Sequence, residues 1–321
     1  MRVLVLHSDV APDAPPEEQD TLIAADAVAG ALTRKGHAAA KAAFRKDAAD
    51  LSALIAQAAP DIVFNLVEGI DGLGQLAPRA PQMLAELGVR FTGVGAAAMA
   101  LTNDKPRTKR LLREAGLPTP DWSEPPDWSG IKDGRYIVKS VLEDASIGLD
   151  DGCVVSGADA VRARAAHSAA RFGGGWFAEE FVEGREFNIG VLETADGPRI
   201  LPMAEMRFEK WPEGKPRIVG YDAKWEEDSS GWNGTVRAFG VERNEPALAA
   251  ALQDAGRRAW SLCGLGGFAR VDFRVSEDGE PLILEINANP CISPDAGFAA
   301  AAEEAGMSYD DLIVAIVEAA R

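Results

Sequence analysis

The sequence has few cysteines and no long apolar run. Its 321 residues include only Cys153, Cys263 and Cys291, which are far apart, so a disulfide framework and the spacing of a zinc site are both excluded. No apolar stretch approaches the roughly 20 residues that span a bilayer. Residues 1–7 are largely apolar but are followed at once by polar Ser8, which predicts a first strand rather than a signal peptide. We expect a soluble, cytoplasmic protein.

Positive charge is also scarce, because 33 lysines and arginines stand against 50 aspartates and glutamates and the net charge is −17. Such an excess disfavours nucleic acids and anionic membranes as partners. An anionic ligand must then be held by locally placed cations or backbone amides. No internal repeat is visible, and Gly72 and Gly74 do not form a dinucleotide-binding fingerprint. A chain of this length can form two or three closely packed lobes.

Alternating strand and helix patterns are what the sequence does contain. The first hundred residues predict an open, doubly wound α/β sheet, with strands at residues 2–6, 38–43, 61–67 and 89–92 and helices at 17–36, 50–58 and 75–87. A helix at 103–116 is expected to begin at a cap of Asn103 or Thr102. The stretch 118–128, rich in proline and tryptophan, reads as a linker. A domain boundary is therefore expected near Leu101.

Two further lobes follow, so the predicted domains are residues 1–101, 102–184 and 185–321. The second lobe is expected to contain strands 136–139, 153–155 and 176–182, a helix at 158–172 and a loop at 140–152. The third is expected to contain strands 186–192 and 200–208, an irregular stretch at 210–234, helices 247–262 and 310–320, and a hairpin.

The hairpin is formed by residues 268–275 and 281–286, which flank Asp278-Gly279, a dipeptide that favours a tight turn. Pairing across this turn places Asp272 opposite Glu285. Two opposed carboxylates repel each other, and a hard divalent cation with oxygen ligands would compensate that repulsion. We interpret the hairpin as a magnesium platform. The alternative is a solvated acidic face.

The same pairing places Arg270 opposite Asn287, on the face that carries the two carboxylates. Side chains alternate along a strand, and the residues of the opposite face are apolar. They are Ala269, Val271, Phe273, Leu284 and Ile286. The polar face is therefore a selected feature, which favours the metal interpretation.

Single charged residues elsewhere are more ambiguous. Lys139 ends an apolar strand and faces the loop 140–152, rich in small residues, where a cation and backbone amides could approach a phosphate. The alternative is a lysine that extends from a strand end to solvent. Lys105 and Lys224 are similar cases. Glu68 follows a strand at the edge where ligands bind in such sheets, and its alternative is a solvated loop carboxylate.

Taken together, these segments resemble the ATP-grasp superfamily, and within it the D-alanine:D-alanine ligase family of carboxylate–amine ligases. The resemblance covers nearly the whole chain. Its firmest segments are TNDKPRTKRLLREAGLPTP, YIVKS with EDASIG, EEFVEGREFNIGVL, DAKW, and GGFARVDFRV through EINANP. It implies an ATP-grasp fold with an N-terminal pre-ATP-grasp domain, ATP and two magnesium ions, or manganese, as cofactors, small amino-acid-like substrates and a homodimer.

The resemblance also implies roles for individual residues. ATP would be bound by Lys105, Lys139, Ser146, Glu179, Glu180, Phe181, Val182 and Glu186. Magnesium would be bound by Asp272, Glu285 and Asn287. The catalytic residues would be Arg270 at the tetrahedral intermediate, Lys224 at the γ-phosphate and Glu17 at an amino group. The substrates would contact Glu68, Asn289, Cys291 and Ser293.

In the reaction that the resemblance implies, a carboxylate attacks the γ-phosphate of ATP to give an acyl phosphate, and an amine then attacks the activated carbonyl. Residues 226–235, rich in glycine and serine and next to Lys224, are expected to form a lid that excludes water.

The sequence departs from the family at five positions. Glu68, Ala145 and Trp225 stand where D-alanine:D-alanine ligases have histidine, serine and tyrosine, and Cys291 and Ala296 stand where they have glycine and a serine that grips a substrate carboxylate. The nucleotide half is kept while the amino-acid half is changed, which predicts a different substrate pair.

The predicted function is therefore an ATP-dependent ligase that forms an amide bond between small amino-acid-like molecules. One alternative is a ligase that adds an amino acid to a peptide or protein terminus. Another is a catalytically silent ATP-binding relative. A silent relative would be expected to have lost a magnesium ligand or Arg270, and none of these residues is lost.

Overall fold

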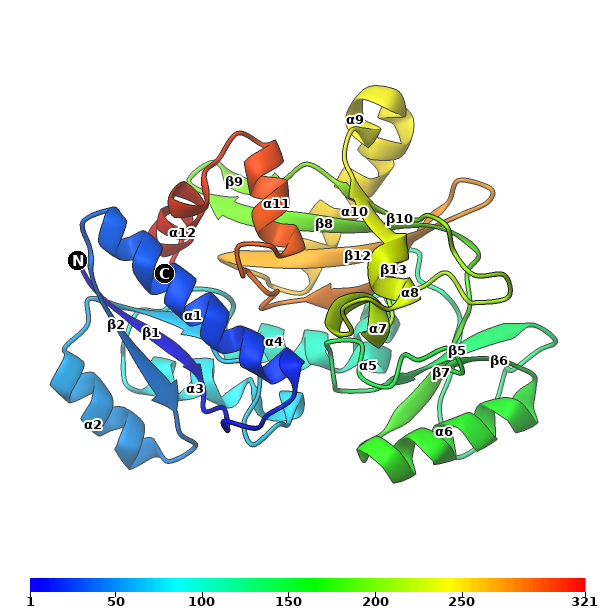
Figure 1. Cartoon of the computed structure of the whole chain (residues 1–321), viewed down its shortest axis with the longest axis horizontal. Coiled ribbons are helices and arrows are strands. Elements are labelled where there is room, and N and C mark those ends of the chain that lie inside the picture. The colour runs from blue at the N-terminus through cyan, green and yellow to red at the C-terminus, as the bar shows by residue number, and fades with distance from the viewer. Residues whose placement is uncertain (321) are drawn as a thin grey trace.

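The computed structural model describes residues 1–320, which form three sheets (Figure 1). The N-terminal sheet is parallel, in the order β2-β1-β3, and consists of β1 (Arg2–Ser8), β2 (Ala38–Phe44) and β3 (Ile62–Leu66). It is accompanied by α1 (Pro16–Arg34), α2 (Ala48–Ala58) and α3 (Arg79–Glu86). Every residue of β3 is buried, as expected of a parallel strand covered on both faces. The α/β class is confirmed.

Two predictions for this lobe are wrong in detail. The predicted strand 89–92 is reduced to one parallel bridge between Val63 and Phe91. The predicted helix 75–87 is divided into a 3-10 turn, η1 (Gly74–Leu76), and α3. Pro78 lies between them and has no N–H to donate to the carbonyl of residue 74, so a continuous helix is interrupted there.

The next two helices, α4 (Ala96–Asn103) and α5 (Lys105–Glu114), meet at Asp104. The predicted cap of Asn103 or Thr102 is wrong, because both residues belong to α4. Asp104 caps α5 instead, and its Oδ1 accepts a hydrogen bond from the backbone N–H of Arg107 at 3.0 Å. Leu101 lies inside α4, and the domain limits remain a prediction.

The central sheet has the order β4-β7-β5-β6 and consists of β4 (Trp122–Ser123), β5 (Arg135–Ser140), β6 (Val154–Ser156) and β7 (Trp176–Glu180). Helix α6 (Ala158–Phe172) lies along it (Figure 1). The interpretation of 118–128 as a linker is wrong. This stretch contains β4, which pairs with β7, and Ser123 and Trp128 are buried. Tryptophan and proline here mark a short edge strand.

The third sheet has the order β11-β10-β8-β12-β13, with β9 also paired to β8. Its strands are β8 (Gly184–Thr194), β9 (Gly197–Ile200), β10 (Ala204–Phe208), β11 (Thr235–Ala238), β12 (Phe268–Ser276) and β13 (Pro281–Asn287). Its helices are α7 (Tyr221–Trp225), α8 (Ser230–Gly234), α9 (Val241–Asn244), α10 (Pro246–Leu262), α11 (Gly297–Glu304) and α12 (Tyr309–Glu318). Within residues 1–320, none of the helices is both long and apolar enough to cross a membrane.

Two predictions for this lobe need correction. The predicted strand 200–208 is two strands, β9 and β10, because Pro202 lies between them and cannot donate to a sheet ladder. The stretch 210–234 is not irregular throughout, since it contains α7 and α8. Strand β11 and helix α11 were not predicted at all.

The hairpin has the predicted register at its polar end but not at its turn. Residues 277–279 form a three-residue loop, in which the N–H of Ser276 donates to the carbonyl of Glu280 at 3.0 Å. This loop would place Asp272 opposite Leu284. A β-bulge at Leu284 shifts the register by one residue, so that Asp272 lies opposite Glu285 as predicted. Because of this bulge, the predicted place of Leu284 on the apolar face of the hairpin is wrong. Ile283, not Leu284, joins the apolar face and is fully buried, whereas Leu284 lines a cavity.

The backbones of the N-terminal and third lobes pack closely against each other at two glycines. Gly267, just before β12, has φ +67°, and a Cβ there would lie 2.8 Å from the backbone N and Cα of Gly93. Gly93 also has a positive φ, of +85°. Gly93 is therefore favoured for its positive φ. Gly267 is required both for its positive φ and because a Cβ would collide with the backbone of Gly93.

We expect Gly267→Ala to lower the free energy of unfolding by at least about 2 kcal/mol, because the new methyl group must displace backbone atoms of the other lobe. The matched control is Gly279→Ala in the hairpin loop, where φ is +82° but nothing lies within 4 Å of the added Cβ. It should cost only about 1 kcal/mol, for the left-handed conformation alone. Denaturant unfolding measures both, and equal losses would show that the lobe contact does not constrain Gly267.

Candidate active site

A cavity of about 710 Å³ opens where the three lobes meet. Its walls come from α1 and the end of β3, from β5, β7 and the loop 140–152, and from β8, α7, β12 and β13. Every predicted site residue lines this cavity except Ser293, which is buried and does not reach the wall. Residues that are far apart in the sequence are thus brought together around one cavity.

Asp272 is held by four side-chain hydrogen bonds. Arg270 donates to both oxygens in a bidentate pair, with Nε to Oδ1 and Nη2 to Oδ2 at 2.8 Å each. Asn188 donates to Oδ1 at 2.8 Å, and Asn287 donates to Oδ2 at 3.1 Å. The carboxylate therefore has a fixed orientation. The amide of Asn287 is fixed with it, which leaves the Asn287 Oδ1 atom available as an acceptor.

Glu285 lies opposite Asp272 and faces a group of cations. Burial alone would raise the pKa of Glu285, but Lys105, Lys139, Lys224 and Arg270 outweigh it and hold the pKa at about 2. Lys105 Nζ lies 4.0 Å from Glu285 Oε2. Glu285 is therefore ionised at neutral pH and can serve as a metal ligand.

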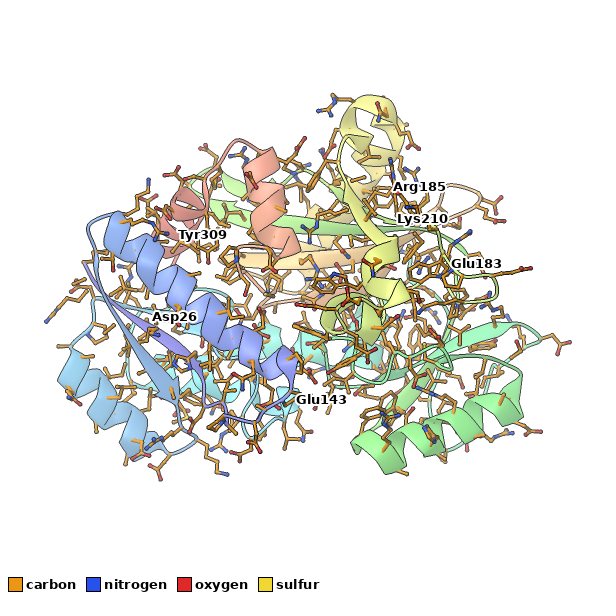
Figure 2. All side chains as sticks on the ribbon, in the orientation of Figure 1. Asp26, Glu143, Glu183, Arg185, Lys210 and Tyr309 are labelled. Carbon is orange, nitrogen blue, oxygen red and sulfur yellow. The ribbon has the colours of Figure 1, made fainter. Side chains whose placement is uncertain are left out.

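Lys105 is one of these cations and also fixes the loop that covers the site. Its Nζ donates to Asp144 Oδ1 at 2.7 Å and to the carbonyl of Glu143 at 2.9 Å. Burial lowers the pKa of Lys105, yet Asp144 and Glu285 outweigh it and raise the pKa above its usual value. Glu143 in turn accepts from the N–H of Gly74 at 2.9 Å, and Figure 2 shows Glu143 at the boundary between the lobes.

Lys139 is positioned by a buried charge triad that the sequence reasoning missed. Glu179 binds Lys139 at 2.7 Å through Oε1 and Lys109 at 2.5 Å through Oε2. Burial would raise the pKa of Glu179, but the two lysines outweigh it and lower it. Burial lowers the pKa of Lys109 to about 8, since Lys109 shares its one carboxylate with a second lysine. Lys109 follows Lys105 by four residues on one helix, the spacing that places both on one face, so a sequence signal existed.

The wall beyond the lysines is less polar. Phe181 and Val182 follow β7 there, and Leu284 is placed there by the bulge. Glu186 lies further along and pairs with Arg274 at 3.1 Å. Burial is the main cause that raises the pKa of Glu186, and Arg274 opposes it.

Loop 143–148 is also held by hydrogen bonds to α7 and to the segment before it, although the family's serine and tyrosine are replaced by Ala145 and Trp225. Trp225 Nε1 donates to the backbone carbonyl of Ala145 at 3.0 Å, and Ser146 Oγ donates to the carbonyl of Val219 at 2.9 Å. Tyr221 on α7 donates its hydroxyl to Glu17 Oε2 at 2.7 Å. Helix α7 therefore connects the loop and the N-terminal lobe through different donors.

The remaining wall is acidic and involves Asp20, another residue that the sequence did not single out. Cys291 Sγ donates to Asp20 Oδ2 at 2.8 Å, and Ser293 Oγ donates to Oδ1 at 2.9 Å. Glu68 is open to the cavity, but protein surrounds the cavity. This burial, together with Asp20 and Asp144, raises the pKa of Glu68 to about 8, against the effect of Arg270. Asn289 donates to the carbonyl of Val67 at 3.3 Å.

The fold of this chain has counterparts among solved structures. A crystal structure of D-alanine–D-alanine ligase from Bacillus anthracis in complex with ATP superposes with a TM-score of 0.75, at 18% identity, over 99% of this chain and 97% of that chain. The fold is therefore the ATP-grasp fold, as predicted.

Sequence comparison identifies the family. Residues 135–318 match the family model described as D-ala D-ala ligase C-terminus. The D-alanine–D-alanine ligase of Chromohalobacter salexigens is 33% identical over 94% of this chain and 90% of its own length. An uncharacterised protein, y4sG, of Sinorhizobium fredii is 31% identical over 81% of this chain and 74% of its own length. The chain belongs to the D-alanine–D-alanine ligase family. It is an ATP-dependent ligase that forms a carbon–nitrogen bond, as predicted.

We expect Lys109→Met to lower the free energy of unfolding by about 3 to 5 kcal/mol, because it leaves the buried Glu179 with one cation in place of two. The control is Arg110→Ala, one residue further on α5. Arg110 forms a surface ion pair with Glu124, and its loss should cost less than about 1 kcal/mol. Denaturant unfolding compares the two variants. Similar small losses in both would show that the triad contributes no more than a surface pair.

Proposed function

We propose that the protein joins two small amino-acid-like substrates through an acyl phosphate and releases ADP and phosphate. The observation that carries this proposal is the convergence of Lys105, Lys139, Lys224 and Arg270 on Glu285 within one cavity. Such a density of fixed positive charge suits a polyphosphate and the anionic states of its transfer. The homodimer implied by the resemblance stays a prediction.

We further propose that Asp272, Glu285 and Asn287 hold two magnesium ions. Within residues 1–320 no group of three or more His, Cys, Asp or Glu side chains is arranged to hold a metal ion, so a metal here would depend on two carboxylates and an amide oxygen. That all-oxygen set fits a hard divalent cation, and Glu285 is already ionised. Bound magnesium would neutralise charge on the transferred phosphoryl group.

The chain's own residues would position the phosphates of ATP and the reacting groups of the substrates. Lys105 and Lys139 would orient the phosphates, and Lys224 would reach the γ-phosphate as a substrate carboxylate oxygen bonds to phosphorus and the bond to ADP breaks. An amine would then attack the acyl carbon, and phosphate would leave. Arg270 uses Nε and Nη2 on Asp272, so Nη1 remains as a donor for the oxyanion of that second step.

The amino-acid side of the cavity supports a substrate pair other than two D-alanines. Glu68 introduces a carboxyl group there. Cys291 stands in place of the family's glycine, and its thiol donates a hydrogen bond to Asp20. Because its pKa is raised to about 8, Glu68 is largely protonated at neutral pH until a partner is bound, so this acidic wall favours a substrate with a complementary polar or cationic group. Glu17 is positioned by Tyr221 and would bind an amino group.

The direct test is ADP release from ATP and magnesium with D- and L-amino acids offered singly and in pairs. We expect release with a pair other than two D-alanines. With D-alanine alone, turnover should fall well below the ~1 to 10³ per second typical of enzymes. Glu285→Gln should abolish release, and unchanged release would refute the assigned site. Turnover of D-alanine within the typical range would refute the substrate proposal.

Arg270→Lys should keep the affinity for ATP near that of the wild type and reduce kcat by about 10²-fold, the loss expected when an oriented oxyanion donor is removed. Lysine keeps the charge beside Asp272 but cannot reproduce the bidentate pair and a third donor together. Equilibrium nucleotide binding and saturated turnover separate the two effects. A variant that is less stable and binds ATP weakly, yet turns over normally at saturation, would show that Arg270 only balances charge.

A further inference from the structure

Strand β11 brings a polar face to the cavity that has no counterpart among the predicted site residues. Thr235 and Arg237 are two positions apart on this edge strand, so their side chains lie on the same face, and both line the cavity. Within residues 1–320, Thr235 Oγ1 and Arg237 Nε are buried atoms without a hydrogen-bond partner. Buried polar atoms are normally paired, so this face is suited to a group that the protein does not supply.

The surroundings of Arg237 indicate the charge of that group. Its guanidinium packs over Gly297, the first residue of α11, because a Cβ on Gly297 would lie 3.7 Å from Nη2 and 3.8 Å from Nε. Nη1 reaches the carbonyl of Asp295 only at 3.5 Å, and no described carboxylate forms an ion pair with Arg237. Burial lowers the pKa of Arg237, Asp295 raises it and Arg270 lowers it, with a net lowering. A cation in this position gains from an anionic ligand.

We propose that Arg237, assisted by Thr235, binds the carboxylate of the amine-donating substrate. This assignment rests on the ligase function proposed above. The amine-donating substrate, which accepts the acyl group and is called the acceptor below, would then be an α-amino acid rather than a simple amine. The planar guanidinium can bind a carboxylate through two parallel hydrogen bonds, and the threonine hydroxyl can donate a third. The acid group would thereby be held beside Arg270, so that the amine of the same molecule can reach the acyl carbon.

The position of the subsite also explains one departure from the family. Ala296 stands where a serine is expected to grip a substrate carboxylate, and it immediately precedes Gly297, over which Arg237 lies. The lost hydroxyl is thus adjacent to a guanidinium supplied by another element. Helix α11 begins without a side-chain cap, so its first amide groups remain as further donors on the same side.

The kinetic test compares Arg237→Ala, Arg237→Lys and Thr235→Val with the wild type on the amino-acid pair found by ADP release. We expect the KM for the acceptor to rise by about 10²-fold in Arg237→Ala, less in Arg237→Lys, and the KM for ATP to stay unchanged. The wild type should discriminate against the acceptor's α-amide, and Arg237→Ala should lose that discrimination. The control is Arg207→Ala, because Arg207 lies on the neighbouring strand β10, is exposed and bonds to Glu205. An unchanged acceptor KM in Arg237→Ala would overturn the assignment.

A binding test that needs no turnover separates this assignment from the ligase proposal. Phenylglyoxal should label Arg237, as detected by peptide mass spectrometry, and amino acids from the same panel should slow the labelling while their α-amides should not. If every amino acid leaves the labelling rate unchanged, the subsite is wrong, whatever the ADP release. If protection is seen but no pair releases ADP in the wild type, the carboxylate subsite stands and the ligase proposal fails.

Discussion

Two carboxylates on neighbouring strands, Asp272 and Glu285, repel each other, and the rest of the site is organised around that repulsion. Arg270 neutralises Asp272 from the same strand through a bidentate pair. Glu285 is instead stabilised by lysines of three separate elements, Lys105 at the start of α5, Lys139 on β5 and Lys224 on α7. Opposite charges in a poorly solvated cleft interact more strongly than they do at a surface. Glu285 therefore connects α5, β5 and α7 electrostatically to the third sheet across the cavity.

The same electrostatics explains how a chain with a net charge of −17 can bind a polyphosphate. Two of the lysines that would receive the phosphates are each fixed by a carboxylate: Lys105 by Asp144, and Lys139 by Glu179. Glu179 is fixed in turn by Lys109. The Lys105–Asp144 and Lys139–Glu179 pairs are each neutral overall, but they reduce the rotamer freedom that the lysines would otherwise lose on binding. Local orientation rather than overall charge thus makes the site receptive to an anion.

Much of this site could be predicted from the sequence, because the residues that carry it lie at the ends of strong strand patterns. The pairing of Asp272 with Glu285 was correct for an incomplete reason. The loop after β12 is one residue longer than a two-residue turn, and the bulge at Leu284 cancels the shift. A bulge depends on packing on both faces of the sheet and leaves no periodic signal. Strand β4 was missed because its two residues are too few for alternation to show, and β11 because it follows the loop-like segment that contains α8.

Departures from a family do not all carry the same weight once their contacts are known. Replacing the expected serine and tyrosine with Ala145 and Trp225 has not removed the tie on loop 143–148, because the acceptor is the Ala145 carbonyl, which every residue possesses, and Trp225 supplies a new donor. These two changes therefore leave loop 143–148 tied to α7 and give no information about the substrate. Glu68 and Cys291 differ, since their side chains face the cavity and alter its charge and volume directly. The proposed change of amino-acid substrate therefore depends on that wall, where a substrate atom would meet a carboxyl group or a thiol in place of an imidazole or an open backbone.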